Sequence, residues 1–160
     1  MGIEAIVIPT GRGAKEDLER ARRAMDYCRE KGLPMRYLIS GLGPDSDRVI
    51  SQGESSLGLD FHQELYDFML KNCKGIFGWD TNSTDSAGNI KNSFPDGVSG
   101  EYAIVSYPLH LARLKRIFKR AVERGEASKD VSLIYVPTGQ SLRQTVYGAM
   151  SLIKDFRKHT

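Results

Sequence analysis

The sequence predicts an α/β fold in which helices cover both faces of a parallel sheet. Short apolar segments alternate with amphipathic segments of helical period along all 160 residues. The short segments are nearly continuous in apolar residues, which is typical of strands buried on both faces of a sheet. Because right-handed crossovers join successive parallel strands, this alternation leaves few other architectures. The length suits one domain, and we expect a single domain over residues 1–160.

The first half of the chain contains two predicted strands and two predicted helices. Residues 3–8 form a short apolar run that ends in a turn with proline and glycine, as expected for a buried strand. Residues 14–31 carry apolar side chains at helical spacing, and residues 35–39 form the second short apolar run. Residues 46–56 are polar and lack a period, which indicates a surface loop. Amphipathic spacing at residues 57–70 predicts the second helix.

The second half continues the alternation of strands and helices. Residues 75–78 are a short candidate for an edge strand, which could pair between subunits of an oligomer. The Ser, Thr, Asp and Asn residues of segment 82–89 favour turns and can cap a short helix at residues 85–92. The remaining elements are predicted as a strand at 102–105, a helix at 108–124, a strand at 131–136 and a closing helix at 141–156.

Composition excludes several classes of function. The net charge is only +3 at pH 7, so the chain as a whole does not require nucleic acid as a partner. Cys28 and Cys73 lie far apart without a CxxC motif, which favours two buried free thiols in a reducing compartment and no metal site. No apolar run approaches the roughly 20 residues that cross a bilayer, and the first residues carry no basic region. We therefore expect a cytoplasmic protein without a membrane partner.

Small and polar residues follow the predicted strands. In parallel α/β sheets the carboxyl ends of the strands share one edge, and ligands bind there, where the strand order reverses. Glycines in the first turn would let backbone N–H groups approach an anion, although its spacing matches neither a Walker loop nor G-x-G-x-x-G. The alternative is that these glycines serve only the tight first turn that any parallel α/β domain needs, without binding an anion. The candidates at this edge are Thr10, Gly11, Arg12, Gly13, Ser40, Gly41, Ser83, Asp85, Ser86, Asn89 and Ser106.

His110 and Arg113 lie in the first turns of the helix predicted at 108–124. Ser106 can cap this helix, Pro108 suits its first turn, and the positive end of the helix dipole favours a neutral imidazole. A neutral imidazole can accept or donate a proton near pH 7. Arg113, one turn further on, supplies a fork for a phosphate or carboxylate. The alternative is a surface histidine and arginine on a basic helix.

Residues 112–125 are strongly basic. They hold six basic side chains and one acidic side chain, a local charge of +5, so the remainder of the protein carries −2. Such a helix can bind nucleic acid or acidic lipid, but no aromatic stacking platform accompanies it, which favours a solvated face. A non-catalytic module that uses this helix to bind an acidic partner is therefore the alternative function.

Four short motifs occur in a fixed order along the chain. They are Arg20-x-x-x-Ala24, Leu38-Ile-Ser-Gly41, Ser83-x-Asp85-Ser86-x-x-Asn89 and Val105-Ser-x-x-x-His110-x-x-Arg113. Their order and spacing resemble the YdcF/SanA/ElyC-like family of nucleotide-fold domains. That resemblance implies a three-layer, Rossmann-like sheet of about five parallel strands in the order 3-2-1-4-5. The chain departs from the family pattern at Gly88, where a Glu is common, and at Ser86, where a Thr is usual.

The resemblance also implies a function. The family's shared polar residues line one pocket, and S-adenosylmethionine has been associated with YdcF-like members. We therefore expect an anionic small molecule as partner, either a nucleotide-like or phosphorylated compound or S-adenosylmethionine. His110 and Arg113 are the catalytic candidates, and catalysis would be transfer or hydrolysis at a phosphate or an activated carbon.

Overall fold

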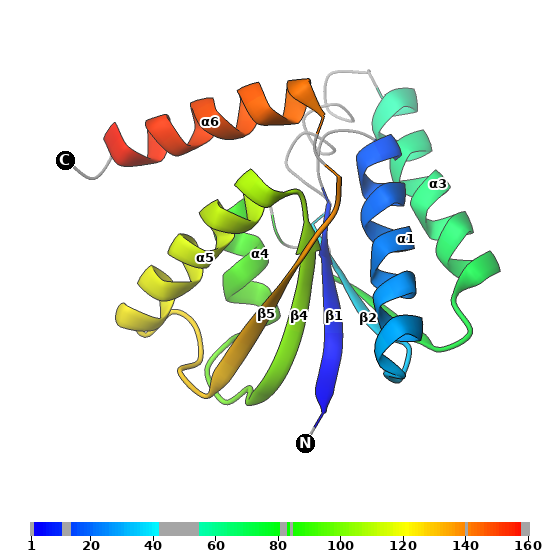
Figure 1. The fold of residues 1–160 in the computed structure, drawn as a ribbon, viewed down its shortest axis with the longest axis horizontal. Helices are drawn as coiled ribbons and strands as arrows, with labels where there is room; N and C mark the ends of the chain where they lie inside the picture. Colours follow the sequence, from blue (N-terminus) through cyan, green and yellow to red (C-terminus); the bar gives the residue numbers. More distant parts are fainter. Residues whose placement is uncertain are drawn as a thin grey trace.

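The computed structural model describes residues 2–10, 14–41, 55–80, 83, 85–139 and 141–157. Five parallel strands form one sheet in the order β3-β2-β1-β4-β5, so the predicted Rossmann-like α/β architecture and strand order are confirmed (Figure 1). The strands are β1 (Ile3–Pro9), β2 (Arg36–Ser40), β3 (Ile76–Asp80), β4 (Gly100–Ser106) and β5 (Val131–Pro137). The helices are α1 (Ala14–Lys31), α3 (Ser55–Asn72), α4 (Ser86–Ser93), α5 (Pro108–Glu123) and α6 (Leu142–Arg157).

Two apolar cores lie on opposite faces of the sheet. Alternate residues of a strand point to opposite faces, so Ile6 and Ile8 of β1 join the core under α1 and α3, whereas Val7 joins the core under α4 and α5. Figure 1 shows the same division, with α1 and α3 on one side and α4 and α5 on the other. Leu65 of α3 and Leu114 of α5 are fully buried in their respective cores.

Some element boundaries differ from the prediction. Strand β3 lies at the edge of the sheet as expected, but it runs to Asp80, two residues beyond the predicted end. Helix α3 already begins at Ser55, inside the predicted loop, and the earlier part of that loop lies outside the described residues. Cys28 is buried as predicted, whereas Cys73 is only partly buried because it lies in the connection after α3 ends.

Helix α6 does not cover a face of the sheet. It begins at a capping box, in which the Ser141 hydroxyl accepts from the Gln144 N–H and the Gln144 side chain accepts from the Ser141 N–H. Figure 1 shows α6 running across the molecule beyond the carboxyl ends of the strands. Its main contacts are with α5. In the described part of the chain, no helix combines the length and apolarity that a membrane crossing requires.

Candidate functional site

The carboxyl edge of the sheet brings most of the predicted site residues into two hydrogen-bonded groups. The predicted Gly11, Arg12 and Gly13 lie outside the described residues. The first group, the histidine group, consists of Ser86, Ser106, His110, Arg113 and their partners. The second group, the asparagine group, consists of Thr10, Ser40, Gly41, Asp80, Ser83 and Asn89.

The histidine group joins three elements around one imidazole. Nδ1 of His110 lies 2.7 Å from Oγ of Ser106 at the end of β4, and Nε2 lies 3.2 Å from Oγ of Ser86 in the first turn of α4. Arg113, one turn beyond His110 on α5, donates from Nη1 to the same Ser86 oxygen at 3.4 Å. Two of the four sequence motifs, at residues 83–89 and 105–113, therefore meet at this point.

Helix α1 adds a buried ion pair to the histidine group. Arg20 donates from Nε to Oγ of Ser106 at 3.0 Å and from Nη1 to Oδ1 of Asp17 at 2.7 Å. Both charged side chains are almost completely buried. Neither residue is among the predicted site residues, although the sequence contains a pattern that could have identified Asp17. Asp17 is four positions before the buried Ala21, so a charge falls on the apolar stripe of the helix.

The hydrogen-bond partners of Ser106 favour one tautomer of the His110 imidazole. Oγ of Ser106 already accepts from Arg20, so we assign its own proton to the short bond with Nδ1 of His110. Nδ1 is then an acceptor, and the imidazole proton lies on Nε2, which faces Ser86. The Ser86 oxygen consequently receives two donors, one from His110 and one from Arg113.

The imidazole of His110 is neutral near pH 7. Burial lowers the pKa of His110 to about 3, and the nearby positive charges of Arg20 and Arg113 add to the effect. The neutral form was expected from the dipole of α5, but desolvation and two guanidinium groups are its main causes. A histidine with so low a pKa is a weak base, so it serves better as a neutral donor than as a proton acceptor.

Ser106 does not cap α5, contrary to the prediction. The N-cap residue is Tyr107, which makes no side-chain capping bond. Ser106 is unavailable because its hydroxyl is engaged by Arg20 and His110. Asp85, in contrast, does cap α4, where its carboxylate accepts the N–H of Gly88 at 2.7 Å.

The fork of Arg113 is partly occupied within the protein. Asp155 of α6 accepts from Nε at 2.6 Å and from Nη2 at 3.3 Å, which is the paired geometry by which arginine binds carboxylates. Along this edge of the guanidinium, the fork that was predicted for a phosphate or carboxylate holds a carboxylate of the protein itself. Asp155 instead holds Arg113 so that its remaining nitrogen, Nη1, points to Ser86.

The asparagine group surrounds a buried acceptor. Asn89 is only 6% exposed, yet its Oδ1 has no hydrogen-bond partner among the described residues. Gly41 lies beside it with a φ of +99°, and a Cβ at that position would lie 2.8 Å from Oδ1 of Asn89 and 3.0 Å from Oγ1 of Thr10. The absence of a side chain at Gly41 therefore leaves room next to the amide.

Asp80 is the acidic member of the asparagine group. Its carboxylate accepts from Ser83 and, at 3.4 Å, from Ser40 on the adjacent strand. The parallel register places Ser40 directly beside Asp80, at the ends of β2 and β3. Asp80 is not among the predicted site residues because the predicted strand ends at Gly78. A strand extended by two residues would have placed this carboxylate at the carboxyl edge.

Helix α4 connects the two groups. Ser86, in its first turn, contacts His110, whereas Asn89, three positions later, lies against Gly41. The backbone carbonyl of Asn89 also accepts from the Ser40 hydroxyl at 3.5 Å. The two groups therefore belong to one polar edge that β1, β2, β3, β4 and the first turns of α4 and α5 build together.

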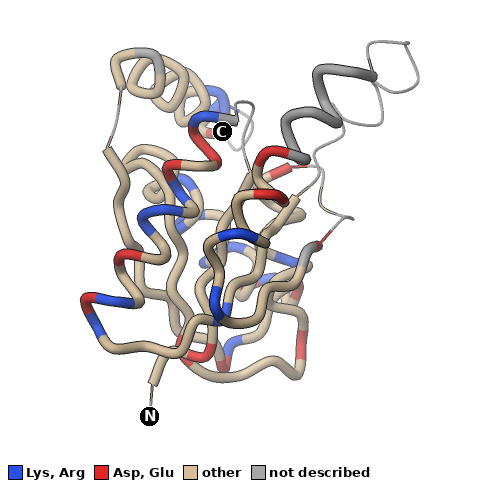
Figure 2. The backbone as a smooth tube through the Cα atoms, turned by 90° about the vertical axis from the view of Figure 1, so that its right-hand side faces the viewer, with Lys and Arg blue, Asp and Glu red and all other residues tan. Residues whose placement is uncertain are grey.

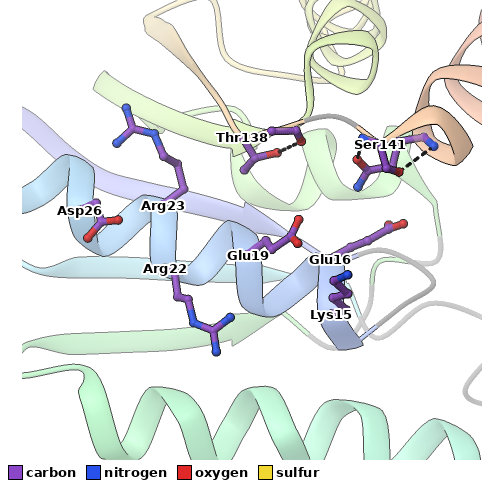
Figure 3. A pocket seen from close by; sticks show the side chains of 10 residues that line it. Lys15, Glu16, Glu19, Arg22, Arg23, Asp26, Thr138 and Ser141 are labelled. Atoms are coloured by element: carbon purple, nitrogen blue, oxygen red, sulfur yellow. Dashed lines mark hydrogen bonds between the residues drawn. The ribbon is translucent and has the colours of Figure 1, made fainter.

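A separate hollow of about 670 Å³ lies between α1 and the residues that lead from β5 into α6 (Figure 3). None of the predicted site residues lines it, and its charged residues are three bases and three acids, so it favours neither sign of ligand. We therefore place the candidate site at the polar edge, where buried donors and an unpaired acceptor occur. The hollow is lined by Lys15, Glu16, Glu19, Arg22, Arg23, Asp26, Thr138, Gly139, Ser141 and Gln144.

The fold and the polar edge together define a Rossmann-like α/β domain with a candidate ligand site at the carboxyl ends of its strands. Comparison with protein-family models, with curated proteins and with solved structures finds no match for this chain. The resemblance of its motifs to the YdcF/SanA/ElyC-like family therefore stays a prediction.

Proposed function

We propose that the protein binds a phosphorylated or nucleotide-like small molecule at the polar edge, with an oxyanion of the ligand next to Ser86, His110 and Arg113. The observation that carries this proposal is the convergence of His110 Nε2 and Arg113 Nη1 on the Ser86 oxygen. A ligand oxyanion at this position would receive the same donors and the Ser86 hydroxyl proton. The order of the four sequence motifs supports the same function.

The charges around the histidine group suit an anion. His110 contributes a neutral donor, whereas Arg113 contributes a permanent positive charge that Asp155 orients. The beginning of α4 lies at the same place, and the positive end of a helix dipole favours negative charge. Because Asp155 neutralises part of the Arg113 charge, we expect selective but moderate affinity for a single oxyanion.

The asparagine group supplies the second half of the proposed site. The unpaired Oδ1 of Asn89 requires a donor, since a buried acceptor without a partner costs about 1–3 kcal/mol. A hydroxyl or amino group of the ligand would satisfy it. Nucleotides and phosphorylated sugars carry both an oxyanion and such donors, and S-adenosylmethionine carries a carboxylate, an amino group and hydroxyls.

If the site is catalytic, its residues favour stabilisation of negative charge over proton abstraction. His110 is too weak a base in the unliganded protein, but its Nε2 proton and Arg113 would both stabilise charge that develops on a transferred group. Transfer or hydrolysis at a phosphate or an activated carbon fits this arrangement. S-Adenosylmethionine and nucleotides are the candidate cofactors.

Isothermal titration calorimetry with pyrophosphate, AMP, ATP and S-adenosylmethionine tests the proposal. His110→Ala and Arg113→Ala should each weaken binding of the preferred ligand by about tenfold or more, because each removes a donor to the anion. Lys119→Ala, an exposed cation on the same helix, is the matched control and should bind as the wild type does. Equal affinities in the wild type and both site variants would refute the assigned roles.

The alternative function, an acidic-partner module built on residues 112–125, has less support. In the structure Arg113 pairs with Asp155, Arg116 stacks on Phe156, and Lys115 lies over Tyr135. Half of the six cations are therefore engaged within the protein. Nucleic-acid binding that weakens steeply with salt and depends on Lys119 and Arg120 would revive this alternative.

A further inference from the structure

Helix α6 exposes a continuous apolar stripe. Its members recur every three or four positions, so they share one side of the helix. Single exposed apolar side chains are ordinary on protein surfaces, whereas a stripe along a whole helix indicates a contact surface. The stripe consists of Leu142 (81% exposed), Val146 (52%), Met150 (65%), Ile153 (54%) and Phe156 (56%).

The polar side of α6 faces the protein and fixes the orientation of the stripe. Asp155 is bound by Arg113 of α5, and Gln144 is buried in the capping box. Gly148 packs so closely on Leu109 that an added Cβ would lie 2.8 Å from the Cβ of Leu109. Because these contacts use the polar and small residues, the apolar side is directed outward. Figure 1 shows α6 at one margin of the molecule, beyond the carboxyl ends of the strands.

Positive charges border the stripe, and its exposed side carries no carboxylate among the described residues. Lys154 and Arg157 are exposed near the end of α6 (Figure 2), and Arg116 of α5 lies over the ring of Phe156, 3.9 Å from its centre. Residues 142–157 contain one acidic residue, Asp155, whose carboxylate is bound by Arg113. The outer side of α6 therefore combines large apolar groups with cations alone.

We propose that α6 docks on an anionic membrane surface, with the apolar stripe at the boundary between headgroups and acyl chains. Amphipathic helices that lie in this plane have an apolar side and basic flanks, and anionic lipids attract those flanks. The sequence expectation of no membrane partner rests on the absence of a spanning segment. A surface-bound helix needs none, so this proposal revises that expectation.

Charge distinguishes this partner from the alternatives. A second copy of the chain would present the same cations around the same stripe, so it would offer no complementary charge. A nucleic acid would complement the cations but would leave the five large apolar side chains in water. A single protruding helix also presents a ridge rather than a groove, and a ridge can enter a lipid surface without other elements following it.

Vesicle co-sedimentation tests the proposal. The wild-type protein should bind vesicles of phosphatidylcholine with phosphatidylglycerol, should bind pure phosphatidylcholine much more weakly, and should dissociate as salt rises. Val146→Ser with Ile153→Ser should weaken binding more than about tenfold by removing inserted side chains. Lys154→Gln with Arg157→Gln should weaken it roughly tenfold by removing two cations near the surface.

Matched controls and a second measurement keep the proposal falsifiable. Leu70→Ser removes a 58%-exposed apolar side chain from α3, and Lys71→Gln removes an exposed cation there; neither should change vesicle binding. Circular dichroism checks that each variant folds. If Val146→Ser with Ile153→Ser does not fold, Met150→Ser takes its place as the stripe variant. The proposal would be overturned if the wild-type protein did not bind the vesicles, or if the stripe variants bound them as well as the wild type does. Sedimentation equilibrium showing a dimer that Val146→Ser with Ile153→Ser dissociates would assign the stripe to a second copy instead.

Discussion

His110 shows how one side chain depends on contacts from several elements. Sequence signals within a few positions place His110 at the start of α5, but its hydrogen-bond partners are Ser106 of β4 and Ser86 of α4. Its charge state depends on burial and on Arg20 of α1. A histidine in this setting is neutral near pH 7, and its protonation is costly for the folded state.

This cost predicts how stability depends on pH. The pKa of His110 is about 3 in the folded protein and 6.5 when unperturbed, so below pH 6.5 the unfolded state binds the proton first. The free energy of unfolding should therefore decrease as the pH is lowered from 6.5 to 3, with His110 contributing about 1.4 kcal/mol per pH unit.

Urea denaturation of the wild type and His110→Gln at several pH values measures this contribution. The amide of Gln does not titrate, so the variant should lose less stability between pH 6.5 and pH 4 than the wild type does. Parallel curves for the two proteins would show that His110 is readily protonated in the folded state.

Substitution of Gly41 should have a steric effect that can be measured separately from backbone strain. Gly41→Ala places a Cβ 2.8 Å from Oδ1 of Asn89 on a backbone with positive φ, and we expect a loss of about 2–4 kcal/mol. Gly97→Ala is the matched control, since its φ is +90° and nothing lies within 4 Å of the added Cβ. It should lose only about 1–2 kcal/mol. Equal losses in chemical denaturation would mean that Asn89 moves aside at little cost.

At the scale of the elements, an ion pair contributes to the contact between α5 and α6. Asp155 and Arg113 are both partly buried, so their attraction is less screened than that of a surface pair. Asp155→Asn should lower stability by about 1–3 kcal/mol, speed amide exchange in α6 and weaken anion binding, because Arg113 is no longer oriented.

Asp26→Asn is the matched control for this ion pair. Asp26 pairs with Arg29 on the exposed side of α1, with both side chains more than half exposed, and its loss should change stability by less than about 0.5 kcal/mol. If Asp155→Asn changed stability, amide exchange and anion affinity no more than Asp26→Asn did, the proposed role of the α6 carboxylate would be wrong.

At the scale of the whole molecule, the sheet couples two separate cores. Leu65→Ala and Leu114→Ala each remove a fully buried side chain from opposite faces, and each should cost about 2–5 kcal/mol. Because both cores share the same five strands, each variant should still unfold in one transition, coincident by far- and near-ultraviolet circular dichroism. Non-coincident transitions in either variant would show that the two faces unfold separately.

The accuracy of the predictions varied with the range of the interactions. The helix at residues 14–31 was predicted with the bounds that the structure shows, because apolar spacing and the following Gly-Leu-Pro segment are local signals. Strand β3 was predicted too short, since Trp79 and Asp80 continue it only by pairing with Ile39 and Ser40. The prediction placed Ser40, Ser86, Ser106 and His110 at one edge because their segments follow predicted parallel strands, and the structure brings them there.

The sequence by itself determined the alternation of strands and helices, the parallel sheet and, except for β3, the region in which each strand ends. These follow from spacing and turn chemistry within a few positions of the chain. Only the tertiary structure decided that Arg20 supports Ser106, 86 positions away, that Asp155 occupies the fork of Arg113, 42 positions away, and that α6 turns its apolar side outward. Such pairings depend on how the elements pack, and several partners would satisfy the same local pattern equally well.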